Sequence, residues 1–194
     1  MDDAFRIVAE MHQSIWERLR RALEDLNPEE IQWRFLPQAN SINLIIRHLR
    51  IEAAWHLASL ERGEPMPTIA APVHQKDVDA VPFDFEENLN ALEGLFTRFC
   101  TALRAHSLET LRENTAAAYG GAVTDKGIVY LLAYHQATHM ATHCGQIQTI
   151  RNLYRKTRGE PARFSADNPT YPDSNPRTEP PPNSACSRRR PART

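Results

Sequence analysis

The sequence lacks any apolar stretch of 18 or more residues, so we expect no transmembrane helix. It also lacks an excess of charge of either sign, because 23 basic and 24 acidic residues leave a net charge of -1. A balanced charge provides no general electrostatic attraction to nucleic acid or to an acidic membrane surface. We therefore expect neither nucleic acid nor a membrane as a partner.

Cysteine is scarce, and the N-terminal residues do not have the pattern of a secretory signal. The three cysteines, Cys100, Cys144 and Cys186, form no C-x-x-C pair, which indicates reduced thiols. The N-terminal segment MDDAFRIVAEMHQ is acidic and amphipathic, whereas a secretory signal has a basic start followed by an apolar run. We therefore predict a cytoplasmic protein.

Proline divides the chain into two unequal parts. Residues 165–194 contain seven of the fourteen prolines and almost no apolar side chain to bury. Such a composition is typical of a disordered segment. We predict one helical domain over residues 1–164, followed by a disordered Pro- and Arg-rich tail over residues 165–194.

Four long segments repeat apolar residues with the period of an amphipathic helix. They cover residues 3–26, 41–62, 84–106 and 124–158, with two short helices over residues 28–34 and 107–114. A proline-rich connection over residues 64–83 joins the second and third long segments. The predicted fold class is all-α, a four-helix bundle with one long crossover plus short extra helices.

The predicted helix ends carry the residues that such ends prefer. Asn40 or Ser41 can cap the second long helix, and Asp84 with Glu87 three residues later forms a capping-box pattern for the third. Gly159 follows the last helix as a C-terminal stop. In the first helix the apolar positions are Ala4, Val8, Met11, Ile15, Leu19, Ala22 and Leu26.

Histidines recur every four residues in the last long helix. His135, His139 and His143 therefore share one helix face, which we predict to be its inner face. His48 lies on the inward edge of the second long helix. Buried imidazoles need partners, and one metal ion satisfies several of them at once. We predict His48, His139 and His143 as metal ligands.

Three imidazole ligands leave a coordination position open, which is typical of a catalytic metal site. Imidazole suits several divalent ions, so zinc or nickel is expected first and iron or manganese is the alternative. The competing interpretation is that these histidines are core residues with ordinary partners. The spacing of three histidines on one face favours the metal.

Other residues near this pattern have simpler interpretations. H-E-x-x-H is absent, which argues against a metallopeptidase. Glu52, one turn after His48, is a candidate base or a residue that orients a ligand, although a solvent-exposed charge is the simpler interpretation. Cys144 is expected to be buried. Gly145 within a helix indicates a close approach of two helices. We expect surface or loop positions for three other histidines, which are His12, His74 and His106.

Two segments resemble helices of the DinB/YfiT-like metalloenzyme family. They are SINLIIRHL, from Ser41 to Leu49, and H-x-x-x-H-x-x-x-H-x-G-Q-I, from His135 to Ile147. The resemblance covers about residues 1–160 and implies a four-helix bundle with a metal bound by His48, His139 and His143. It implies a place for His135 beside these ligands or in the access channel. It also implies a homodimer.

The resemblance further implies a reaction, because characterised relatives include thiol-dependent S-transferases and a mycothiol-dependent maleylpyruvate isomerase. We therefore expect a small-molecule substrate together with a low-molecular-weight thiol. Two alternatives remain open at this stage. One is a metal-dependent hydrolase that uses metal-bound water, and the other is a non-catalytic metal-binding stress or binding protein.

Overall fold

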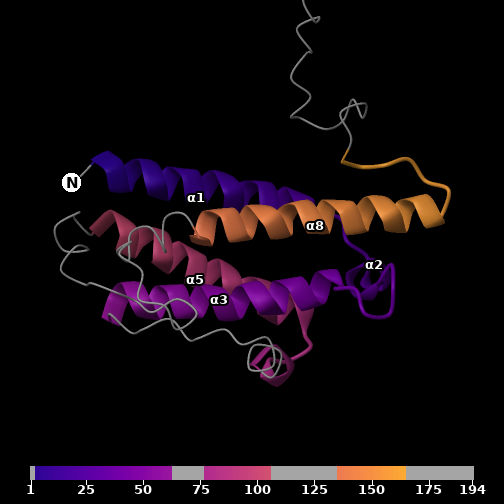
Figure 1. The fold of residues 1–194 in the computed structure, drawn as a ribbon, viewed down its shortest axis with the longest axis horizontal. Helices are drawn as coiled ribbons and strands as arrows, with labels where there is room; N and C mark the ends of the chain where they lie inside the picture. Colours follow the sequence, from indigo (N-terminus) through magenta and orange to yellow (C-terminus); the bar gives the residue numbers. More distant parts are fainter. Residues whose placement is uncertain (1–2, 63–76, 106–134, 165–194) are drawn as a thin grey trace, which may run out of the picture.

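The structure, a computed structural model, describes residues 3–62, 77–105 and 135–164, and over these ranges it contains helices and no strand. The helices are α1 (Asp3–Ala22), α2 (Pro28–Gln32), α3 (Ile42–Arg62), α5 (Phe85–Ala105) and α8 (Gln136–Thr157). Figure 1 shows that the four long helices lie side by side as a bundle, with the short α2 at one end. The predicted all-α bundle is therefore confirmed. None of the described helices is long and apolar enough to cross a membrane.

The order of the helices around the bundle is α1, α5, α3, α8, so that each packs on two neighbours. α3 and α5 run parallel, because Arg50 of α3 pairs with Glu87 and Glu61 pairs with Arg98, at the same offset along both helices. Two neighbouring parallel helices cannot be joined by a tight turn. The predicted long crossover supplies this connection.

The end of the crossover is held by polar side chains of the bundle. Arg47 of α3 is buried and donates to the carbonyl oxygens of Val78 and Val81. Asn43 donates to the carbonyl oxygen of Phe83 at 3.0 Å. These bonds between side chains of α3 and backbone carbonyl groups fix residues 78–83 against α3.

The starts of α3 and α5 and the end of α8 match the sequence expectations, whereas α1 ends at Ala22, before the predicted end at residue 26. The Ser41 hydroxyl accepts from the Leu44 amide at 3.2 Å, and the Asp84 carboxylate accepts from the Glu87 amide at 2.9 Å. Both bonds satisfy amides that have no partner within the first turn of a helix. Gly159, with φ of 72°, follows the end of α8 in the left-handed conformation that favours glycine. The predicted start of the last helix and the predicted helix over residues 107–114 lie outside the described residues.

The inner face of α1 agrees with the predicted apolar stripe at Leu19 and Ala22, which are fully buried, but differs from it in the N-terminal half of the helix. Met11 is exposed and Val8 and Ile15 are only half-buried, whereas the most buried positions are Phe5, Ala9, His12, Trp16 and Leu19. Trp16 stacks on Phe96 of α5, with ring centroids 5.0 Å apart. The large aromatic rings of the partner helix therefore select the face, and they rotate α1 by about one position from the stripe with the most regular aliphatic spacing.

Gly145 does not mark a close helix approach, contrary to the sequence expectation. A Cβ placed on Gly145 meets no heavy atom within 4 Å. We therefore expect Gly145→Ala to raise the free energy of unfolding by about 1 kcal/mol, because glycine costs about that much relative to alanine within a helix. Urea unfolding followed by circular dichroism measures this gain. Gly159→Ala is the contrasting variant and should lose stability, because its backbone is left-handed. If Gly145→Ala instead unfolds more easily than the wild type, the close helix approach expected from the sequence would be supported.

Candidate metal centre

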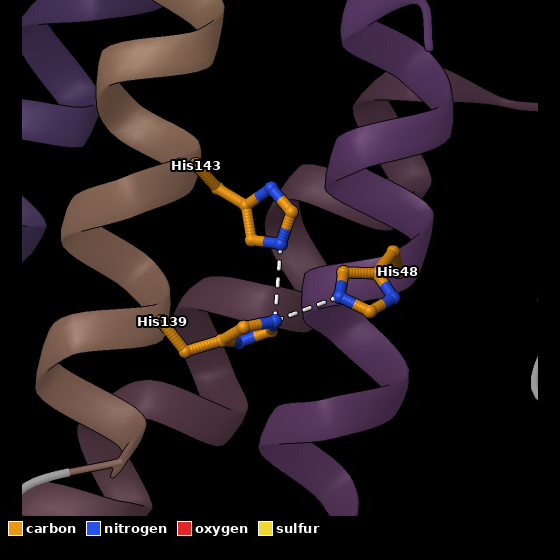
Figure 2. Close-up of side chains that lie close together, drawn as sticks. All are labelled: His48, His139 and His143. Carbon is orange, nitrogen blue, oxygen red and sulfur yellow. Dashed lines mark hydrogen bonds between the residues drawn. The ribbon is translucent and has the colours of Figure 1, made fainter. Parts of the chain in front are cut away.

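Two antiparallel helices bring His48, His139 and His143 together. His48 belongs to α3 and the other two to α8, and Figure 2 shows the three rings pointing toward one another between these helices. The Nε2 atom of His139 lies 2.9 Å from Nε2 of His48 and 3.0 Å from Nε2 of His143. The three residues predicted from the sequence therefore form one cluster, in which each ring offers one nitrogen.

The cluster lies at the edge of the core, not at its centre. All three histidines are half-buried, whereas Met140, Cys144 and Ile147 of the same helix are buried in the apolar core. The predicted inner position of the histidines is therefore wrong by about one position, whereas Ile147 and Cys144 are buried as expected. This position leaves the imidazoles partly open to solvent.

Local contacts and burial prepare the rings to act as ligands. The Nδ1–H group of His143 donates to the Oε1 atom of Gln146 at 2.8 Å, which leaves the Nε2 lone pair directed at the cluster. Burial, followed by the effect of four neighbouring imidazoles, lowers the pKa of His139 to about 2. His139 is therefore neutral at physiological pH, as a metal ligand must be.

The donor set fits a divalent transition-metal ion. Two nitrogens bound to one tetrahedral zinc at about 2.05 Å would lie about 3.3 Å apart. The observed separations of 2.9 and 3.0 Å differ from that value by a few tenths of an ångström. The buried Nδ1 atom of His139 has no hydrogen-bond partner in the described part of the chain. Three converging imidazoles at this spacing can thus be satisfied by one ion, with the ligands that the sequence predicts.

The sequence model of the DinB superfamily matches residues 11–147. This range covers well over half of the chain and includes the three clustered histidines. The chain belongs to the DinB superfamily. Comparisons with curated proteins and with solved structures gave no match. Membership of the DinB superfamily and the histidine cluster are together compatible with a metal-dependent function.

His135 of this DinB-superfamily protein lies beside the three-histidine cluster but faces another residue. Its ring stacks on that of His139, with centroids 5.3 Å apart and planes 12° from parallel. Its Nδ1 atom lies 3.3 Å from Nε2 of His56, which is on α3. The antiparallel packing of α3 on α8 therefore pairs His56 with His135, one step along from the pairing of His48 with His139.

Glu52 is buried, so its interpretation as a solvent-exposed charge is wrong. Its relative exposure is 1%, and burial raises the pKa of its carboxyl group to about 7. The Oε2 atom lies 3.9 Å from Nδ1 of His56. Glu52 thus belongs with His56 and His135 and not with the three-histidine cluster. This position carries a signal in the sequence, since His48, Glu52 and His56 form one line along the edge of α3.

His12 is likewise buried, contrary to the sequence expectation. Its Nδ1 atom lies 2.8 Å from the carbonyl oxygen of Val8, and its ring packs against Phe99 of α5 with centroids 5.3 Å apart. Its charge would lower the pKa of His56, so the two imidazoles are electrostatic neighbours. His74 and His106 lie outside the described residues.

Proposed function

We propose that this protein is a metal-dependent enzyme that transfers a low-molecular-weight thiol to a small electrophile, or isomerises a substrate with the help of that thiol. The observation that carries the proposal is the convergence of three imidazole nitrogens, from two facing helices, beside a cavity. His48, His139 and His143 would hold zinc or nickel, with iron or manganese as the alternative. A divalent ion at such a site is a Lewis acid that lowers the pKa of a thiol or of water.

The cavity that supports this proposal measures about 580 Å³, which suits a small molecule. It is lined mainly by apolar side chains, among them Phe35, Ile45, Ile150 and Leu153. Ile45 and Gln146, which also line it, lie one helical turn from His48 and His143. None of the three histidines lines the cavity itself, so an apolar electrophile bound there would lie about one helical turn from the cluster.

Gln146 connects the cavity to the histidine cluster. Its Oε1 atom accepts from the Nδ1–H group of His143, and its side chain also lines the cavity. Gln146 thus holds the ring of His143 in the tautomer that leaves Nε2 available. Burial keeps the imidazole of His139 neutral, so the site needs no general base to free that nitrogen.

The homodimer and the cytoplasmic setting remain predictions. Ile7 and Met11, one turn apart on α1, are exposed large apolar side chains. Such an exposed apolar pair on α1 is the feature that a dimer interface would cover. We propose this face of α1 as the place to look for a second copy of the chain.

The reaction can be tested with the metal-loaded, untagged protein. We expect it to consume glutathione or another low-molecular-weight thiol in the presence of an epoxide or haloalkane. A maleyl compound should instead be isomerised only when the thiol is present, without net loss of the thiol, and its ultraviolet absorption follows that reaction. The rate should fall at least about 100-fold in His143→Ala, because metal assistance contributes several kcal/mol to such steps. Thiol consumption, measured with a chromogenic disulfide reagent, gives the rate.

Controls without thiol separate the rival functions. Turnover of esters, amides or lactones in the absence of thiol would instead assign hydrolysis. Absence of turnover with both panels would leave a non-catalytic metal-binding protein. Thiol transfer that survives in His48→Ala, His139→Ala and His143→Ala would contradict the proposal, since no predicted ligand would then be needed.

A further inference from the structure

A second cluster of metal-binding side chains lies beside the three-histidine cluster. Glu52 and His56 of α3 and His135 at the start of α8 each offer one ligand atom, and these atoms lie within 4.8 Å of one another. We propose that these three residues bind a second divalent transition-metal ion. This proposal goes beyond the thiol chemistry and does not depend on it.

The hydrogen bonds of His56 leave the correct nitrogen available. Its Nδ1 lies 2.6 Å from the carbonyl oxygen of Glu52, one turn earlier on the same helix. A carbonyl oxygen accepts and cannot donate, so Nδ1 carries the proton and Nε2 carries the lone pair. That Nε2 atom faces Nδ1 of His135 at 3.3 Å, in two rings whose planes are 14° from parallel. A backbone carbonyl that fixes the tautomer of a histidine in this way is a recurrent feature of metal sites.

The burial of Glu52 provides an independent argument for a cation. Glu52 and His56 are both 1% exposed, on a helix face covered by the bundle. A carboxylate removed from water requires a positive charge or several donors to remain ionised. A divalent ion held by Glu52, His56 and His135 would supply such a charge.

The type of donor set indicates which ions would bind. Two imidazoles and one carboxylate form a combination that zinc and non-haem iron use in proteins, with positions left open. The carboxylate makes this cluster harder in character than the neighbouring three imidazoles, which would favour manganese or iron more strongly there.

The two clusters are adjacent, so the two ions would lie at neighbouring positions along the interface between α3 and α8. The rings of His135 and His139 stack with centroids 5.3 Å apart, and each ring belongs to a different cluster. The antiparallel register of α3 on α8 produces both clusters, because it places His48 against His139 and His56 against His135. We therefore infer that each chain binds two ions.

The stoichiometry of metal binding tests this inference. The full-length untagged protein is stripped with a chelator, titrated with Co²⁺ and followed by visible absorption, and the bound metal is counted by elemental analysis after desalting. We expect two Co²⁺ per chain for the wild type and one for Glu52→Gln and for His135→Ala. Glu61→Gln, an exposed position on the same helix, is the matched control and should retain two.

Three results would overturn the second site. The first is a single bound ion per chain that is lost in His139→Ala and retained in Glu52→Gln. The second is two bound ions that both remain in Glu52→Gln and in His135→Ala. The third is no bound Co²⁺ at all. Glu52→Gln keeps the volume of the side chain, and its folding is checked by circular dichroism. If Glu52→Gln fails to fold, the number of ions bound by His135→Ala provides the test, because His135 is only half-buried. Failure of thiol transfer, in contrast, would leave the count of two ions intact.

Discussion

Replacing His139 with alanine is expected to lower the affinity for a divalent metal ion at least about 100-fold. His139 is the central ring of the cluster, with its Nε2 atom 2.9 and 3.0 Å from those of His48 and His143. Loss of a residue that only orients a ligand already costs about 10- to 100-fold in affinity, so loss of the central ligand should cost at least as much. Competition with a coloured chelator for Zn²⁺ measures the affinity.

A control on the same helix makes this result specific. Thr149→Ala removes an exposed hydroxyl that bonds to the carbonyl oxygen of Gly145, and it should leave the affinity unchanged. Performing the titration in a Glu52→Gln background isolates the three-histidine cluster from its neighbour. If His139→Ala binds zinc within about threefold of its background, the metal assignment is wrong. The histidines would then be ordinary partly buried residues.

Replacing Arg151 with methionine is expected to destabilise the protein by about 3–5 kcal/mol. The guanidinium is buried, pairs with the carboxylate of Glu30 at 2.7 Å and donates to the carbonyl oxygens of Ala22 and Glu24. The substitution leaves a buried carboxylate without its cation and the end of α1 without its donor, and breaking such a pair costs about this amount. Urea unfolding of the metal-free protein measures the loss.

The exposed pair between Arg158 and Glu29 is the matched control for this experiment. Its N–O distance is 3.2 Å, but both side chains are largely exposed, so Arg158→Met should cost less than about 1 kcal/mol. The double variant Glu30→Leu with Arg151→Met should recover part of the stability, because no buried charge then remains alone. Equal effects of Arg151→Met and Arg158→Met would contradict the buried role of Arg151.

Helix period and end signals made most of the fold predictable. The crossover prolines, Ser41, Asp84 and Gly159 mark boundaries through local backbone chemistry, and the structure confirms the ends of α3, α5 and α8 that they predict. The predicted domain boundary at residue 164 stays a prediction. Asn152 bonds to Arg163 and Phe164, which ties the last described residues to α8. The predicted tail over residues 165–194 lies outside the described residues.

The sequence by itself determined which residues share a helix face. A spacing of four placed His135, His139 and His143 along one side of α8, and the same rule aligned His48, Glu52 and His56 along α3. These are local consequences of 3.6 residues per turn, and no partner helix is needed to establish them.

Tertiary packing alone decided how those two lines meet. The antiparallel register of α3 on α8 places His48 with His139 and His143, and it groups Glu52 and His56 with His135 in a separate cluster. The same packing buries Glu52, His12 and Arg151. Glu52 and His12 had been expected at the surface because they are polar, and no sequence pattern indicated the burial of Arg151. A repeat pattern fixes the direction of a side chain on its own helix. The neighbour it meets depends on helix order, direction and axial register, and these are set by the summed packing of the whole core.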